Sequence, residues 1–302
     1  MTNRTVRFLV CSAIGLALAG SRAFAQDNPP AEGAATPPPA AGGEAAPAVA
    51  ATQPAAPAGA GNPTDITLKA GQVGAEADVA ISLTKELVGK PFSIVPNVYY
   101  GVNDQLSVGL ASNPGSEVFQ SPAAGNGLCL AGTSGGCGKI YSNISLDALF
   151  SFMRSSTMDL GAHGGLDTSF GDSTLLGVRV GVKSRMLAGP AILTIDPALL
   201  IGVNHRDIGN KEALIVPVRV GFMATPQLNL GLSVALIGLL DPPVGGFGDS
   251  YQVPVGIGGT FAINNNISAR AQFTLDNLGG KLPDGVGRAD MRSLSFGAVY
   301  RM

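Results

Sequence analysis

A period of two in the apolar residues constrains the fold of this chain more than any other feature. In residues 227–236, QLNLGLSVAL, apolar residues alternate with small or polar ones. Successive side chains point to opposite faces of a β-strand, whereas a helix repeats about every 3.6 residues. This stretch therefore predicts a strand with one apolar face, formed by Leu228, Leu230, Leu232, Val234 and Leu236.

The same alternation recurs from Asp65 to the C-terminus and predicts an all-β fold. Most stretches are about ten residues long, which is the length that a tilted strand needs to cross a bilayer. Strands of soluble proteins are shorter, typically about five or six residues. About twelve strands are expected, over residues 75–84, 92–102, 105–112, 141–153, 158–169, 175–184, 191–203, 213–224, 227–239, 251–263, 267–276 and 291–302.

The connections between these strands alternate between short and long. Tight turns rich in Asn, Asp, Pro and Ser are expected at 102–105, 154–157, 224–227 and 264–267. Longer links, many of them rich in glycine, lie between them at 112–140, 204–212, 240–250 and 277–290. Short turns at one end and long loops at the other are typical of an up-and-down antiparallel barrel in a membrane, with the long loops outside the cell.

Composition favours a membrane barrel over a soluble β-sandwich, which is the chief rival. Charged residues are only 13% of the chain, about half the share in soluble proteins. The solvent face of a sandwich should be rich in Lys, Glu and Thr, but the face opposite the apolar one carries mainly Gly, Ser, Asn and Asp. Past residue 25 no apolar run is long enough for a spanning helix. The formal net charge of −2 predicts no nucleic-acid partner.

Residues 1–25 have the parts of a secretory signal peptide. Arg4 and Arg7 precede an apolar segment over residues 8–19, and an A-x-A site ends at Ala25. Cleavage is expected directly after that site. A membrane anchor fits less well, because the apolar segment is short. The mature chain is therefore expected to be exported.

Residues 26–63 are dominated by Ala, Pro and Gly and have no periodic apolar face. Such a segment buries too little surface to offset its conformational entropy. It predicts a disordered extension in front of a barrel domain at 64–302. The extension is either a plain linker or a periplasmic spacer that reaches the cell wall.

Two cysteines remain once the signal peptide is removed, Cys129 and Cys137, within GLCLAGTSGGCGK. In an exported protein such a close pair predicts a disulfide that closes a small loop. Two thiols without a nearby histidine make a poor metal site. The sequence therefore predicts no metal ion, and it points to no other cofactor.

Aromatic residues recur where the expected strands run down to the short turns, and they share the parity of the apolar face. Rings at one depth form a girdle at a membrane interface. The C-terminal stretch, LSFGAVYRM, also keeps its apolar alternation to the end. The expected girdle residues are Tyr100, Phe152, Phe222, Phe261 and Tyr300.

Over residues 65–302 these features resemble the outer-membrane β-barrel proteins of Gram-negative bacteria, without indicating a narrower family. The apolar ending is similar to their C-terminal sorting signal, although Met302 stands where that signal usually has an aromatic residue. The resemblance implies a transmembrane up-and-down antiparallel barrel in the outer membrane. It also implies lipid around the apolar face and porin-like transport of small polar solutes.

If the apolar face meets lipid, the opposite parity faces a lumen with few charges, which are of both signs. Opposed charges across a pore select polar solutes, whereas charges that pair with one another merely fill the lumen. The sequence leaves both interpretations open. The candidate charge filter consists of Asp147, Asp159, Asp167, Asp196, Arg179, Lys183, Arg219 and Arg270.

The expected function is passive diffusion of small hydrophilic solutes, with no enzymatic activity. A closed barrel that displays its outer loops is the alternative. A membrane hydrolase is a third class, based on His163, which shares its parity with Asp159 and Asp167. No nucleophile is fixed within reach of that histidine. The other histidine, His205, lies in an expected loop.

Overall fold

The computed structural model describes residues 65–83, 91–112, 125–132, 137, 139–208, 210–242, 246–280 and 292–302. The expected signal peptide (1–25) and the expected disordered extension (26–63) lie outside these residues and stay predictions. In the described part of the chain, no helix is long and apolar enough to cross a membrane.

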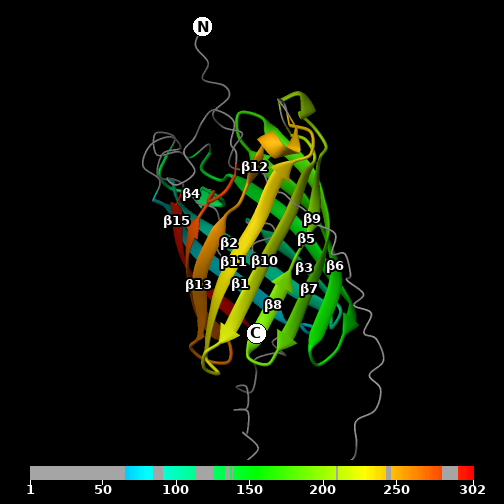
Figure 1. Cartoon of the computed structure of the whole chain (residues 1–302), viewed down its shortest axis with the longest axis vertical. Helices are drawn as coiled ribbons and strands as arrows, with labels where there is room; N and C mark the ends of the chain where they lie inside the picture. The colour runs from blue at the N-terminus through cyan, green and yellow to red at the C-terminus, as the bar shows by residue number, and fades with distance from the viewer. Residues whose placement is uncertain are drawn as a thin grey trace, which may run out of the picture. The chain divides into compact units, whose positions relative to one another are not determined.

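Twelve antiparallel strands, two of them interrupted, form a closed ring (Figure 1). The last strand pairs with the first, so the ring has no open sheet edge. The twelve are β1 (Val73–Ser82), β2 (Phe92–Asn103), β3 (Leu106–Ala111), β5 (Asn143–Arg154), β6 (Met158–Phe170), β7 (Thr174–Ala188), β8 with β9 (Ala191–Ile195 and Ala198–Gly202), β10 (Ala213–Met223), β11 (Leu228–Leu239), β12 with β13 (Tyr251–Gln252 and Val255–Ala262), β14 (Ile267–Leu275) and β15 (Arg292–Arg301).

The alternation predicted these strands correctly, apart from two interruptions and one extension. Pro197 separates β8 from β9 and Pro254 separates β12 from β13, because proline has no N–H for the ladder. Their carbonyls still accept hydrogen bonds, from Val182 N at 2.9 Å and from Ala235 N at 3.0 Å. β7 continues beyond its expected end at residue 184, to Ala188.

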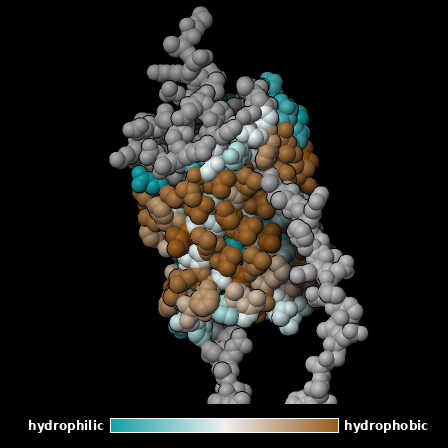
Figure 2. Space-filling view, in the orientation of Figure 1, coloured by the Kyte–Doolittle hydropathy of each residue, from teal (hydrophilic) through white to brown (hydrophobic). Residues whose placement is uncertain are grey.

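The outer surface of the ring is apolar through its middle. Figure 2 shows this as a brown band, between paler ends, on the face in view. Leu166 on β6 and Leu232 on β11 are 56% and 53% exposed. Exposing so much contiguous apolar surface to water is unfavourable, whereas exposing it to hydrocarbon is not. The alternating face therefore forms an apolar belt around the outside of the barrel.

The two ends of the ring differ in their connections. Tight turns join β2 to β3, β5 to β6, β7 to β8, β10 to β11 and β13 to β14 at one end, here the short-turn end. The chain terminus at Met302 lies at this end as well (Figure 1). The opposite, loop end carries the longer links, together with one short link at 171–173.

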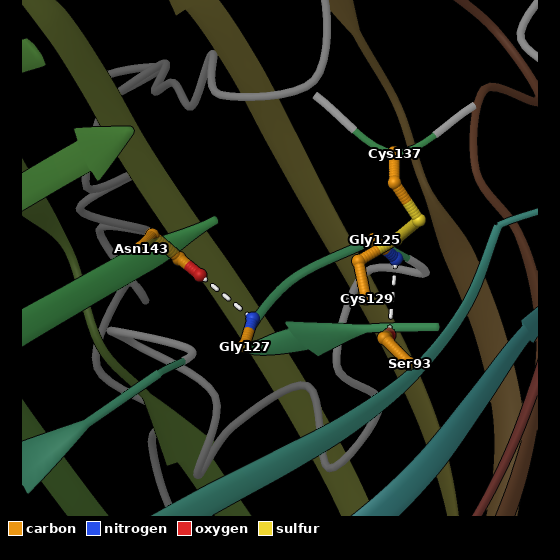
Figure 3. Close-up of a disulfide and its surroundings, with 6 residues drawn as sticks. All are labelled: Ser93, Gly125, Gly127, Cys129, Cys137 and Asn143. Carbon is orange, nitrogen blue, oxygen red and sulfur yellow. Dashed lines mark hydrogen bonds between the residues drawn. A yellow bond between two sulfur atoms is a disulfide. The ribbon is translucent and has the colours of Figure 1, made fainter. Parts of the chain in front are cut away.

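A disulfide lies in the longest of the loop-end connections (Figure 3). It joins Cys129 to Cys137 with their Cα atoms 5.7 Å apart, and both residues are buried. Cys129 belongs to β4 (Leu128–Cys129), which pairs with β2. The neighbouring Gly127 N–H donates to Asn143 Oδ1 at 2.9 Å. These contacts attach the disulfide segment to the rim of the ring.

Candidate functional site: a charged lumen

The interior of the ring contains the charged side chains that the alternation assigned to it. The four basic candidates are almost fully buried, with exposures of 3% for Arg179, 4% for Lys183, 6% for Arg219 and 7% for Arg270. Burying a charge is strongly unfavourable unless it is paired and hydrogen-bonded. The partners of these residues therefore determine what the lumen can do.

Arg179 on β7 is held by two carboxylates from the two preceding strands. Its Nε donates to Asp167 Oδ2 on β6 at 3.1 Å, and its Nη2 donates to Asp147 Oδ1 on β5. Each aspartate side chain remains 16% exposed. The Arg179 cluster thus presents partly accessible carboxylate oxygens to the lumen.

Arg270 on β14 reaches across β15 to two carboxylates of β1. Its Nε donates to Asp78 Oδ1 at 2.7 Å and its Nη2 donates to Glu76 Oε2 at 3.1 Å. Gly297 on β15 lies between the partners, and a Cβ there would overlap the Asp78 carboxylate. A glycine is required at this point so that the ion pair can cross the strand. In the order of the strands, this cluster lies opposite the Arg179 cluster.

His163 belongs to a third cluster, in which it contacts Asp196. The alternation had grouped His163 with Asp159 and Asp167 instead. Its Nε2 lies 2.7 Å from Asp196 Oδ1, while Lys183 Nζ lies 3.5 Å from Asp196 Oδ2. Asp196 stands at the interruption between β8 and β9. The two aspartates of matching parity, Asp159 and Asp167, contact arginines instead.

Arg219 on β10 differs from the other luminal cations. Among the described residues, no carboxylate lies within ion-pair distance of it, and its Nη2 donates to the amide oxygen of Asn229 at 3.1 Å. In register, Arg219 pairs with Thr194 of β8, which in turn pairs with Arg185 of β7. This register places two arginines, Arg219 and Arg185, in one row across three strands.

Arg154 is a luminal residue for which the sequence pattern predicted a turn. A β-bulge in β5 shifts the register between Ser151 and Met153. Phe152 and Met153 consequently both face outward, each 49% exposed. The next side chain, Arg154, enters the lumen, where its Nη2 lies 2.9 Å from Asp159 Oδ2. Alternation cannot reveal such a bulge, because an inserted residue reverses the parity of the residues after it.

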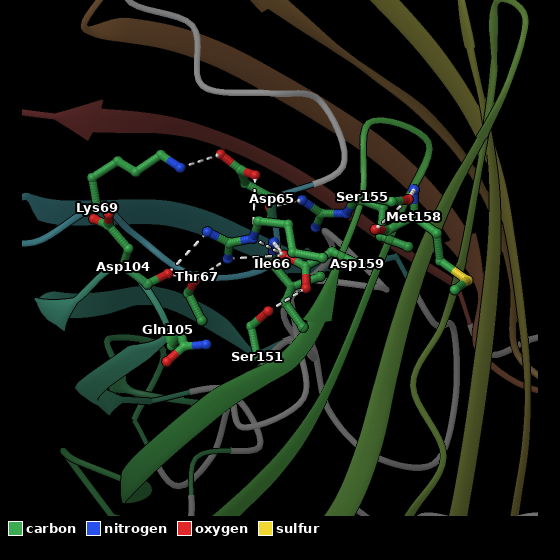
Figure 4. A network of polar contacts seen from close by, with 12 residues as sticks. Asp65, Ile66, Thr67, Lys69, Asp104, Gln105, Ser151, Ser155, Met158 and Asp159 are labelled. Atoms are coloured by element: carbon green, nitrogen blue, oxygen red, sulfur yellow. Dashed lines mark hydrogen bonds and ion pairs between the residues drawn. The ribbon is translucent and has the colours of Figure 1, made fainter.

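Residues 65–69, which precede β1, also lie inside the ring at the short-turn end (Figure 4). Ile66 and Thr67 are only 5% and 6% exposed. Ile66 N–H donates to Asp159 Oδ2 at 3.1 Å, and Leu68 N–H donates to Ser107 Oγ at 2.8 Å. This segment has no strand periodicity, so no pattern in the sequence indicated that it would enter the lumen.

The expected girdle residues are all on the outside, near the strand ends that meet the short turns. Their exposures lie between 41% and 52%, as expected for rings directed away from the lumen. Their role at a membrane interface stays a prediction. The five are Tyr100, Phe152, Phe222, Phe261 and Tyr300.

No family model and no curated protein matches this chain. Among solved structures, a NanC porin matches with a TM-score of 0.51 at 9% identity, over 75% of this chain and 100% of that one. A KdgM porin gives 0.47 at 7% identity, over 74% and 98%. OmpT of Vibrio cholerae gives 0.38 at 12% identity, over 76% and 97%. At this identity the likeness concerns the fold alone, which is that of the Gram-negative outer-membrane β-barrels.

Proposed function

We propose that this protein is a narrow outer-membrane channel for the passive diffusion of small hydrophilic solutes. One observation carries the proposal, namely a closed ring that separates an apolar outer belt from an interior of charged and polar side chains. Such a ring offers a polar solute hydrogen-bonding partners at a depth where lipid offers none. By analogy with barrels of this class, the short turns face the periplasm and the loop end faces outward.

The proposed path is narrow because of the ring size and the luminal side chains. Rings of about eight strands are filled by their side chains, whereas about sixteen to eighteen strands leave a wide aqueous channel. Twelve strands fall between these limits. Arg179 and Arg270 pair with carboxylates on other strands, so these charges are partly compensated while the side chains still occupy the interior. We therefore expect a small conductance with a sharp size limit.

Selection in this channel would come from two charged walls. The Arg179 and Arg270 clusters lie on opposite sides of the ring, and each places one arginine and two carboxylates beside the path. Arg219 adds a cation with no carboxylate partner among the described residues. A solute would exchange water for these groups in passing. No bond is made or broken, so the proposal includes no catalytic residue.

A closed barrel that displays its outer loops is the second candidate function, and burial of the luminal charges favours it. Charges that are already paired can fill a lumen that has no continuous passage. The loop bearing the disulfide would then be the displayed element. A hydrolase is favoured less, because in the described part of the chain the His163 imidazole contacts Asp196 but no serine hydroxyl.

Planar-bilayer recording of the purified protein tests the proposed channel. Discrete openings are expected, and small neutral sugars should reduce the conductance while larger ones should not. The size at which the reduction disappears measures the narrowest point. An absence of openings at all salt concentrations and voltages would favour the closed barrel instead.

A further inference from the structure

We propose that residues Asp65–Lys69 form a removable plug, which narrows the lumen at the short-turn end. The inference rests on the proposed channel function and adds a regulatory element to it. The occupant is a segment of the chain itself, seated in a socket formed by β3, β5, β6 and β7. Four features of the plug and its socket carry the argument.

The main chain of the plug is bound by side chains of the barrel, rather than by a neighbouring strand. Ile66 N–H donates to Asp159 Oδ2 at 3.1 Å and Leu68 N–H donates to Ser107 Oγ at 2.8 Å. Arg185 Nη1 donates to the Asp65 carbonyl at 2.6 Å. These bonds fix the path of the segment, yet none belongs to the β-ladder that closes the ring. The segment can therefore leave without opening the sheet.

Arg154 links the plug to the rim of the ring. Its Nη2 donates to Thr67 Oγ1, and its Nη1 donates to the Asp104 carbonyl in the turn between β2 and β3 at 2.9 Å. Thr67 Oγ1 donates to that same carbonyl at 2.8 Å. Arg154 Nε also lies 3.6 Å from Asp65 Oδ1. One arginine thus contacts the segment at two points, Asp65 and Thr67.

The Ile66 side chain packs against a glycine of the socket. A Cβ at Gly161 of β6 would lie 2.5 Å from the Phe150 carbonyl oxygen and 2.6 Å from Ile66 Cδ1, so a side chain there would crowd both the strand and the plug. Next to it, Ser151 and Asp159 are 1% and 0% exposed, and they contact each other. Ile66 therefore covers a polar pair that an open lumen would otherwise expose.

The position of the plug suggests what moves it. Before Asp65 the sequence holds the Ala/Pro-rich residues 26–63, for which the composition predicts a disordered extension. A partner or the cell wall that holds this extension would pull on Asp65 first. Such a pull would withdraw the plug from the short-turn end and widen the passage. The charge clusters on the barrel wall would stay in place.

Thiol protection tests docking independently of conductance. In the full chain with Cys11→Ser, a Ser151→Cys probe should react slowly with a membrane-impermeant maleimide, because position 151 is 1% exposed and lies beside the docked Ile66. Adding Ile66→Asp places a second carboxylate beside Asp159 and removes the buried side chain. Labelling should then become about tenfold faster or more, given the apolar surface lost. Ile66→Ala, a milder change, should give a smaller increase in the same direction.

Lys69→Gln is the matched control, since the Lys69 side chain belongs to the plug but is 44% exposed and pairs with Asp65 of the plug itself. It should label at the parent rate. Rapid labelling of the parent itself would overturn the docked plug. Heat-dependent gel mobility should verify that every variant has folded.

Bilayer recording then tests whether the plug narrows the path. Ile66→Asp should conduct more than the parent and more than Lys69→Gln. Equal conductances combined with faster labelling would overturn the plug as a restriction. If no variant conducts while the probe remains protected in the parent, the channel function is refuted, but docking of the segment is still supported.

Discussion

The stability of the seam between the first and last strands, β1 and β15, should depend on the buried ion pair of Arg270 with Asp78. Asp78 is 1% exposed and accepts a hydrogen bond from Arg270 Nε at 2.7 Å, across β15. Asp78→Asn removes the negative charge and preserves the shape of the side chain. The Arg270 guanidinium then keeps only Glu76 as a carboxylate partner among the described residues, at 3.1 Å.

The expected loss of stability depends on the burial and on the partner that remains. Removing one partner of a buried ion pair typically destabilises a protein by about 3–5 kcal/mol. Because Glu76 still faces Arg270, we expect a loss at or just below the lower limit of that range, about 2–3 kcal/mol. For a urea dependence of about 2–3 kcal/mol per molar, the unfolding midpoint should fall by about 1 M.

The assay is urea unfolding of the barrel in detergent micelles, followed by far-ultraviolet circular dichroism and by gel mobility. Asp241→Asn is the matched control, because Asp241 is 63% exposed and pairs with Lys211 at 2.6 Å. An exposed pair contributes only about 0–1 kcal/mol, so the control should unfold close to the parent. Equal midpoints for Asp78→Asn and Asp241→Asn would refute the reasoning about the seam.

Three further predictions concern the lumen, the loop end and the disulfide. Arg219→Glu should shift the reversal potential in a salt gradient towards cation selectivity, because Arg219 has no carboxylate partner in the described part of the chain; an unchanged potential would mean that Arg219 does not face the path. Burial raises the pKa of Asp276 to about 7, against the opposing effect of the hydrogen bond that Ser293 donates at 2.8 Å. The pKa of an aspartate in an unfolded chain is about 3.9, so a carboxyl with a higher pKa in the folded protein stabilises the fold fully below pH ~3.9. This stabilisation is lost as the pH rises through about 7. The unfolding midpoint should therefore fall with pH more steeply in the parent than in Asp276→Asn, and parallel curves would contradict the raised pKa. Finally, a maleimide added without reductant should label neither Cys129 nor Cys137, whereas quantitative labelling would show that the disulfide is absent.

The course of the strands could be predicted from the sequence because alternation is a local property. Each residue of QLNLGLSVAL faces the outside or the lumen according to its own parity, whatever strand lies beside it. The same reasoning placed Arg179, Lys183, Arg219 and Arg270 inside, where the structure has them buried. Parity assigns a side of the sheet, but it does not assign a partner.

The errors and omissions all arise where local parity ceases to apply. The bulge at Ser151 and Met153 reversed the facing of Arg154, and the longer β7 brought Arg185 into the lumen. Both arginines were missed for these reasons. The segment Asp65–Lys69 was missed because a chain bound by side chains leaves no periodic pattern.

By itself, the sequence determined that this chain forms long alternating strands with one apolar face, because each strand carries its own outward and luminal residues. Only the tertiary structure decided which luminal charges meet. Arg270 and Asp78 are 192 residues apart, and they come together only because the ring closes between β15 and β1. Closure also creates the enclosed space that receives Ile66. Contacts of this kind depend on register and curvature, which no single stretch of sequence contains.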